Sequence, residues 1–398
     1  MSILKNKLII VAPIIAIIIT CIFAVVQIPG AKQAPKNVPL AIVNEDLGVD
    51  IPNQGKMNFG ATLVDMLNQP MKETSGEAEP AVKWIAVASY QEAKQGMDDK
   101  EYYGALVIPE DYSVKQASLQ TSTPSSPELK IYVNQGKNAT ASNAVTQILN
   151  GIVDNINHKV SGQLIEGLKA HSGNLTIEQA SVLASPITKT VTYLNETRTM
   201  GMAPMALFQP IWMGSLMAAM LLWVSQKKMA YTSKKNKMVT ISIQVVIAAI
   251  ASLLIGFGLT WLADGMLGYD IASFSDTAIF LTITSFSFVL MIEAVLMWIG
   301  LAGMPIFVLL LFFGAPLLSM APEFMPSFYK DWIFSWLPMR IMVEGLQDLF
   351  FFGKGLTWSG PISTLVWIGL GSLIVLFLAT LKPQRVNSSN GHKAVQEI

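Results

Sequence analysis

The fold is decided by the stretch MVTISIQVVIAAIASLLIGFGLTWL, residues 238–262, which contains no charged side chain. An apolar run of about 20 residues is long enough to cross the roughly 30 Å hydrocarbon core of a membrane as a helix. Four other runs have nearly the same character. They are Met205–Ser225, Ala278–Ile299, Met304–Met320 and Pro361–Leu381. The five runs together predict a membrane domain over residues 205–381.

The composition supports an integral membrane protein. Of the 398 residues, 52% are hydrophobic and only 14% are charged, and the mean hydropathy is +0.46. These values are too apolar for an ordinary soluble chain of this length. The 27 basic and 27 acidic residues cancel, so the net charge gives no indication of a nucleic-acid partner.

A sixth apolar run, Leu8–Val26, lies near the N-terminus and follows Lys5 and Lys7. It is longer than the core of a signal peptide and lacks a small-x-small cleavage site, so we interpret residues 8–27 as an uncleaved signal anchor and residues 1–7 as cytoplasmic. The lysine-rich loop after the second span and the tail 382–398 then also lie inside. The sequence predicts six transmembrane helices in a 1+5 arrangement, in the cell membrane, with both termini cytoplasmic.

Residues 28–204 are predicted to form an extracellular α/β domain after the first span. Short runs rich in Val, Ile, Tyr and Trp predict strands at Leu40–Val43, Val82–Ala88, Tyr103–Ile108 and Leu129–Val133. Helical segments are predicted between them at Phe59–Leu67, Tyr90–Met97 and Asp111–Leu119. Alternation of this kind is typical of a layered α/β domain.

From Ala141 the apolar residues recur every three or four positions, which predicts a long amphipathic helix. Two interpretations of its apolar stripe are open. The stripe covers the sheet of the same chain, or it forms a stalk or dimerisation seam.

The external segment 321–360 contains Trp332, Trp336 and Trp358, a residue type that prefers the membrane interface. Pro338 and Gly353 mark the start and end of a helix of about 15 residues, which is too short to span. Polar residues including Arg340 and Glu344 recur at helical spacing. We interpret the segment as re-entrant or interfacial, with Arg340 and Glu344 as candidate transport-path or coupling residues.

Motifs for catalysis are missing from the sequence. There is no Gly-x-x-x-x-Gly-Lys-Ser/Thr sequence for ATP and no Gly-x-Ser-x-Gly nucleophile motif, and the three histidines are scattered. We therefore expect neither an enzyme nor a cofactor or metal site. One ionisable residue, Glu293, lies inside the fourth predicted span, where a carboxylate is costly. It is either a packing residue that locks helices together or a residue of the transport path.

Several segments carry a family resemblance. They are Val38–Gly48 (VPLAIVNEDLG), Gln91–Ala93 with Gly96, Tyr103–Ser113 (YGALVIPEDYS) and Leu337–Leu346 (LPMRIMVEGL). The chain resembles the YhgE/Pip (phage-infection-protein-like) group of bacterial membrane proteins, within the type-2 ABC exporter permeases.

The resemblance implies a permease subunit that moves an unidentified substrate outward together with a separate ATP-binding cassette ATPase subunit. It also implies pairing of two permeases, as a homodimer or a heterodimer. The ATPase would contact the loop Ser225–Lys237, whose only aromatic residue, Tyr231, is a candidate anchor. Alternatively the lysines of this loop only set the topology and bind membrane lipids. A different function is also open, that of a non-transporting surface or assembly protein such as a phage-infection receptor or a secretion-system component.

Overall fold

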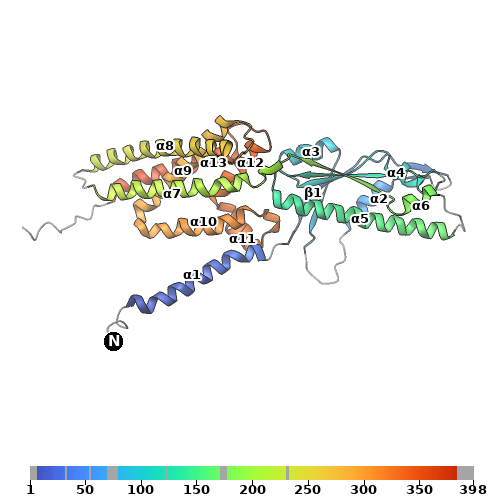
Figure 1. Cartoon of the computed structure of the whole chain (residues 1–398), viewed down its shortest axis with the longest axis horizontal. Helices are drawn as coiled ribbons and strands as arrows, with labels where there is room; N and C mark the ends of the chain where they lie inside the picture. The colour runs from blue at the N-terminus through green and yellow to red at the C-terminus, as the bar shows by residue number, and fades with distance from the viewer. Residues whose placement is uncertain are drawn as a thin grey trace, which may run out of the picture. The chain divides into compact units, whose positions relative to one another are not determined.

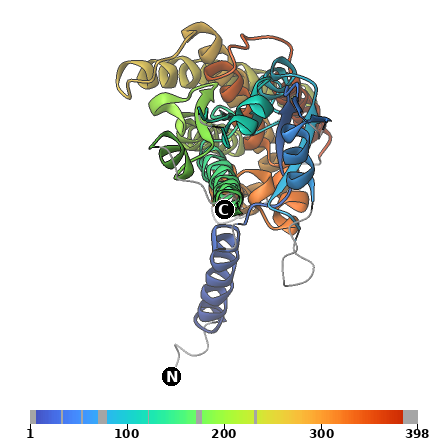
Figure 2. The same ribbon diagram turned by 90° about the vertical axis from the view of Figure 1, so that its right-hand side faces the viewer.

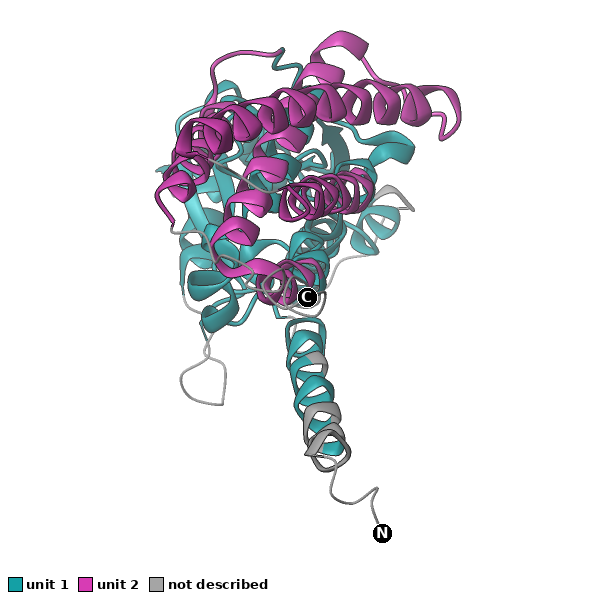
Figure 3. Ribbon diagram, turned by 90° about the vertical axis from the view of Figure 1, so that its left-hand side faces the viewer, with its two compact units in different colours: residues 1–206, 312–355 teal, residues 207–311, 356–398 magenta. Residues whose placement is uncertain are grey.

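The computed structural model describes residues 7–31, 34–52, 55–69, 79–121, 123–170, 177–229 and 233–382. The chain divides into two compact units, shown in different colours in Figure 3. The first joins Met1–Ala206 with Phe312–Gly355, and the second joins Leu207–Leu311 with Leu356–Ile398. The first unit contains a β-sheet, and the second contains long apolar helices.

A five-stranded sheet with the order β4-β1-β5-β6-β7 forms the centre of the first unit (Figure 1). The strands are β1 (Val38–Asn44), β4 (Val82–Val87), β5 (Gly104–Ile108), β6 (Glu128–Asn134) and β7 (Thr188–Leu194). Neighbouring strands are parallel except for β5 and β6, which are antiparallel. The four strands expected from the sequence are confirmed. The fifth strand, β7, was not expected because this edge strand, TKTVTYL, is largely polar and exposed.

Short elements surround the sheet. They are a hairpin of β2 (Val49–Ile51) and β3 (Gly55–Met57), and the helices α2 (Phe59–Asn68), α3 (Tyr90–Asp98), α4 (Tyr112–Ser118), α6 (Ile177–Leu183) and η2 (Arg198–Met200). The predicted helices near residues 59, 90 and 111 are confirmed as α2, α3 and α4.

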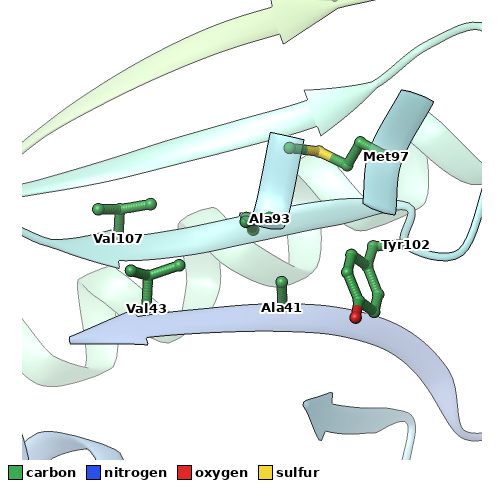
Figure 4. Packing of buried hydrophobic residues seen from close by; sticks show 7 residues of the cluster. Ala41, Val43, Ala93, Met97, Tyr102 and Val107 are labelled. Carbon is green, nitrogen blue, oxygen red and sulfur yellow. The ribbon is translucent and has the colours of Figure 1, made fainter. Parts of the chain in front are cut away.

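Helix α3 covers one face of the sheet. Figure 4 shows Ala93 and Met97 of this helix gathered with Ala41 and Val43 of β1 and Val107 of β5. All five side chains are at most 2% exposed. Small residues on the strands let the helix approach closely, so the apolar area of this face is removed from water.

The opposite face is covered by α5 (Ala139–Ala170), which runs along the sheet in Figure 1 and is seen almost end on in Figure 2. A Cβ atom at Gly104 of β5 would lie 3.2 Å from Cγ1 of Val145 and 3.5 Å from Cδ1 of Leu149. The residues of the apolar stripe from Val145 to Leu164 include a buried side chain at almost every turn. The structure therefore agrees with the interpretation that the stripe covers the sheet of its own chain.

Asp46 organises the loops that follow β1 and β5. Its Oδ1 accepts from the backbone N–H of Ser113 (2.9 Å) and of Gly48 (3.2 Å). Its Oδ2 accepts from the Ser113 hydroxyl and from the backbone N–H of Gly60, at 3.0 Å for the latter. Gly48 has a φ of +78°, a conformation that glycine adopts without strain. These contacts explain why the segments Val38–Gly48 and Tyr103–Ser113 carry Asp, Gly and Ser at these positions.

The second unit is helical, and two of its helices, α7 and α10, extend into residues of the first unit. The long helices are α7 (Ala203–Lys227), α8 (Lys234–Gly265), α9 (Phe274–Ile299), α10 (Met304–Leu318) and α13 (Gly360–Leu378), with the short η3 (Gly300–Gly303) and η6 (Ala379–Leu381). Four segments within the described residues are long and apolar enough to cross a membrane: Ala203–Lys227, Lys234–Gly265, Phe274–Leu318 and Gly360–Leu381. The third of these contains both the predicted fourth and fifth spans.

Helix α1 (Lys7–Ala31) occupies the predicted first span, and its portion Ile17–Ala31 is apolar but shorter than the four candidate spans. The number of six spans and their orientation therefore stay predictions.

The external segment consists of η4 (Pro322–Phe324), α11 (Ser327–Trp332), η5 (Phe334–Trp336) and α12 (Pro338–Phe350). Helix α12 begins at Pro338, and Gly353 follows it with a φ of +60°, which confirms the helix predicted from these two residues. The hydroxyl of Tyr329 in α11 donates a hydrogen bond to the backbone carbonyl of Val25 in α1 at 2.8 Å. Whether α12 enters the outer leaflet stays a prediction.

Candidate functional site

Polar side chains link the helices inside the second unit. The Ser215 hydroxyl of α7 lies 3.0 Å from the Ser285 hydroxyl of α9. Ser287 of α9 donates to the backbone carbonyl of Leu365 in α13 at 2.8 Å. The indole N–H of Trp212 donates to the carbonyl of Phe307 at 3.2 Å. Hydrogen bonds of this kind are worth about 0.6 kcal/mol each in a membrane bundle, so together they define the packing without making it rigid.

Glu293 is fully buried in α9, with 0% of its surface exposed. Neither carboxylate oxygen has a hydrogen-bond partner among the described residues. A buried polar group normally has a partner, so this absence needs an explanation. The candidate residue therefore lies in the interior of the helical unit, where a membrane carboxylate is expected to lie.

Helices α8 and α9 approach closely. Gly256 of α8 is fully enclosed: a Cβ atom there would lie 2.6 Å from the backbone nitrogen of Thr282 and 2.8 Å from the backbone oxygen of Ala278, both in α9. Along α8 the buried residues form one stripe from Ile241 to Ala263, in which every residue after Ile241 is small or polar. Small residues at such a stripe allow backbone contact between membrane helices.

Arg340 and Glu344, the other two described candidates, form an ion pair on α12, with Nε 3.3 Å from Oε1. The guanidinium also lies 5.3 Å from the ring centroid of Phe334. Both side chains are partly exposed, at 31% and 41%, so the pair contributes well under 1 kcal/mol. Burial of the Glu344 carboxyl raises its pKa, although the charges of Arg340 and Lys100 oppose this shift.

The α/β domain is joined to α12 within the first unit by Lys100. Its ammonium forms an ion pair with Oδ1 of Asp348 at 2.8 Å and donates to the carbonyl of Glu344 at 3.2 Å. The two charged side chains are only 20% and 13% exposed. Removing one partner of a largely buried pair leaves the other charge poorly compensated, so this contact should matter more than the Arg340 pair.

A second contact joins the domain to η4. The phenol of Tyr103, just before β5, donates to Oε2 of Glu323 at 2.6 Å. The ammonium of Lys137 lies 3.8 Å from the centroid of the same phenol ring and donates to the carbonyl of Glu101 at 3.0 Å. Gln347 of α12 donates to the backbone carbonyl of Lys137 at 3.2 Å. We name the contacts of Lys100, Tyr103 and Lys137 with residues 323–348 the junction.

Stability of the junction should depend on pH through Lys137. Burial lowers the pKa of its ammonium to about 8, and the charges of Glu323 and Glu101 only partly oppose this. The pKa of an unfolded lysine is about 10.4, so between these values the unfolded chain binds more protons and stability rises with pH. From pH 7.5 to about 9.5 the thermal midpoint of the wild type should rise relative to that of Lys137→Met.

The matched control is Lys56→Met, which removes an exposed lysine of β3 and should follow the wild type at every pH. Parallel curves for the wild type and Lys137→Met would mean that Lys137 titrates in the folded chain as it does in the unfolded one.

The lysine-rich loop is described only at its ends, and Tyr231 lies outside the described residues. After the loop, the Ser233 hydroxyl caps α8 by accepting from the backbone N–H of Asn236 at 3.2 Å. Lys237 donates to the carbonyl of Ala379 at 2.6 Å, and Lys382 donates to the carbonyl of Trp298 at 2.8 Å. Both ammonium groups thus bind carbonyl groups at helix C-termini, where the helix dipole favours a cation.

Of the three candidate residues that the structure describes, Arg340 and Glu344 lie together and Glu293 lies elsewhere, in α9. Lys100, Lys137 and Glu323 were not predicted, because nothing in a linear sequence pairs residues so far apart. Within the part of the chain that the structure describes, no group of three His, Cys, Asp or Glu side chains could hold a metal ion.

Comparison with known proteins gives the family. The profile described as ABC-2 family transporter protein matches residues 7–381, which is nearly the whole chain. The chain therefore belongs to the ABC-2 family of transporter proteins, which are membrane permeases.

Other comparisons add little. None of the curated proteins compared with the chain matches it. A crystal structure of a domain assigned to an ABC type-2 transporter from Thermotoga maritima MSB8 aligns with 16% identity over 41% of this chain and 87% of that chain, with a TM-score of 0.26. At that score the alignment carries no argument about the fold.

Proposed function

We propose that this chain is the membrane-spanning subunit of an ABC-type exporter of the cell membrane, and that it belongs to the YhgE/Pip group. It moves a substrate outward, and a separate ATPase subunit supplies the energy. The family match over residues 7–381 carries this proposal. The sequence supports a separate ATPase because it contains no motif for binding the phosphates of ATP.

The proposed arrangement has six spans, cytoplasmic termini and an outer α/β domain. Lysines favour the cytoplasmic side, and the basic residues before α1, between α7 and α8, and after α13 all agree with this orientation. Two permeases, identical or different, form the path. Within each one, we assign to the path buried polar side chains of the described long helices, among them Ser215, Ser285 and Glu293.

The loop Ser225–Lys237 is the proposed contact with the ATPase. It joins α7 directly to α8, so a displacement of the loop acts on two helices of the same bundle. Lys227 lies 5.2 Å from the ring centroid of Trp223 and Lys237 donates to the carbonyl of Ala379, whereas Lys228, Lys234 and Lys235 are exposed. Tyr231 supplies the aromatic side chain that a docking groove could enclose.

Tyr231→Ala tests this contact. The substitution leaves the charge of the loop unchanged, so insertion and topology should be normal, while retention of the ATPase during affinity purification should fall several-fold. Transport-linked ATP hydrolysis should fall with it. Replacing the five loop lysines by arginine is the matched control, since it keeps charge and lipid attraction and should have little effect.

Two results would count against the proposal. Unchanged retention in Tyr231→Ala would move the contact to Gly300–Gly303 or to the termini. If no ATPase is retained even by the wild type, the chain is not an exporter subunit, and a surface or assembly role becomes the better explanation.

A further inference from the structure

Among the residues that the structure describes, no group neutralises the buried carboxylate of Glu293. An ionised carboxylate in an apolar interior is far more costly than a neutral one, and a protein normally supplies a cation or several donors to hold it. Glu293 has neither: it is 0% exposed, and both oxygens are without hydrogen-bond partners among the described residues.

The position of Glu293 on α9 directs it toward α8. Thr282 of α9 lies against Gly256 of α8. Glu293 follows Thr282 by eleven residues, about three helical turns, and therefore lies on the same face of α9. Side chains on this face meet the buried stripe of α8.

The level of Glu293 along α8 follows from the packing of the two helices. Gly256 meets Ala278 and Thr282, whereas Ile241 shares a buried cluster with Leu290 and Ala294, so the helices run antiparallel. Twelve residues back from Gly256 is Gln244. Twelve residues on from Ala278 and Thr282 are Leu290 and Ala294, which bracket Glu293. Gln244 and Glu293 therefore lie at the same level of facing helices.

Gln244 presents an acceptor at this level. Its Nε2 donates to the backbone carbonyl of Leu222 in α7 at 2.8 Å, and this bond fixes the orientation of the amide. Its Oε1 is buried and has no hydrogen-bond partner among the described residues. The facing surfaces thus hold three acceptor oxygens, two from Glu293 and one from Gln244, and none of them has a donor.

Charged side chains of the neighbouring helices do not supply the missing donor. In the helices packed with α9, charged residues occur only near the ends. They are Lys227 on α7, Lys234, Lys235, Lys237 and Asp264 on α8, and Lys382 after η6; α10 and α13 have none, and α9 itself adds only Asp276 in its first turn. Lys237 and Lys382 are engaged with the carbonyls of Ala379 and Trp298. The described side chains of Glu293 and Gln244 offer a metal ion three oxygens, fewer than the roughly six to eight ligands that calcium takes.

We propose that Glu293 and Gln244 form a proton-binding site between α8 and α9. The proton comes from water and forms an O–H bond on the Glu293 carboxyl group. The resulting carboxylic acid donates a hydrogen bond to Oε1 of Gln244, so each of the two groups then has a hydrogen-bond partner. Separation of α8 from α9 admits water and returns the proton to it, so opening of this helix pair is linked to proton release. The site does not depend on the ATPase subunit.

Infrared spectroscopy of the purified full-length protein tests this site. At neutral pH the wild type should show the C=O band of a protonated carboxylic acid, and the band should move in deuterium oxide. Glu293→Gln keeps the size of the side chain and should lose the band. Asp111→Asn, which removes a carboxylate that is already paired with Lys115, is the control and should keep it.

Gln244→Leu tests the acceptor and keeps the proposal testable if Glu293→Gln is unstable. Its carboxylic acid band should remain but move toward the higher frequency of a free acid. The proposal is overturned if the wild type lacks the band, if Glu293→Gln retains it, or if Gln244→Leu leaves its frequency unchanged. A band present in choline chloride but lost in sodium or potassium chloride would identify a metal cation in place of the proton, and would also overturn it.

Discussion

Gly256→Val should leave almost no folded protein to purify. The new Cβ atom would lie 2.6 Å from the backbone nitrogen of Thr282 and 2.8 Å from the backbone oxygen of Ala278. Backbone atoms cannot rotate away as a side chain can, so α8 and α9 must move apart. Overpacking that shifts backbone costs about 3 kcal/mol, occasionally more. Recovery of monodisperse protein by size-exclusion chromatography and the thermal midpoint after solubilisation measure the effect.

Gly258→Val provides a matched control two positions along the same helix. A Cβ atom at Gly258 meets nothing within 4 Å. The change in helix propensity is the same at both positions, so it cancels in the comparison. Gly258→Val should therefore purify like the wild type. Equal recovery of both variants would show that the close approach of α8 and α9 is not needed for the native packing.

Asp348→Ala should loosen the junction between the α/β domain and α12. It leaves the Lys100 ammonium, which is 20% exposed, without the carboxylate that lies 2.8 Å from it. Breaking one side of a fully buried pair typically costs about 3 kcal/mol and breaking an exposed pair costs little, so the cost for this largely buried pair should lie between these limits. Faster amide hydrogen exchange in α12 and in the turn around Lys100 should report this loss, with α8 and α9 unchanged.

The exposed pair of Lys115 and Asp111, with side chains 33% and 52% exposed, supplies the comparison for Asp348→Ala. Asp111→Ala should change exchange only locally in α4. The double variant Lys100→Met with Asp348→Ala should recover part of the protection, because it removes the uncompensated charge. If Asp348→Ala exchanges like the wild type, the ion pair does not hold the junction together.

Apolar patterning made the helices and the buried strands predictable. The runs that became α7, α8 and α13 are uninterrupted, and β1 and β5 are rich in Val, Ile, Leu and Ala because both of their faces are covered. Pro338 and Gly353 also predicted α12 correctly, because proline is favoured at the first position of a helix and glycine just after its end. Signals of this kind act within one helix or strand.

Elements that lack such a signal were missed. Strand β7 pairs with β6 over seven residues, yet it is an edge strand with four polar side chains, so its alternation is weak. The hairpin of β2 and β3 has only three residues per strand. Short or exposed strands depend on their partners more than on their own composition.

The candidate sites divide in the same way. Glu293 stood out because a charge is rare inside an apolar run, and its burial matches that reasoning. The junction could not be predicted from the sequence, because Lys100 and the Glu344 carbonyl that it contacts are 244 residues apart. Ordinary surface residues acquire such a role only when distant segments meet.

The junction also bears on how the chain is made. Glu323, Gln347 and Asp348 are synthesised after the sheet and after helices α7 to α10. The ribosome therefore delivers the partners of Lys100, Tyr103 and Lys137 last, when residues 38–194 have already had time to form the sheet. Until residues 322–348 have been synthesised, the side chains of Lys100, Tyr103 and Lys137 have no partners from this segment and remain in contact with water. Synthesis of the first unit is thus completed late, after α10 and before α13, and a chain that ends before residue 322 has a sheet without its partner segment.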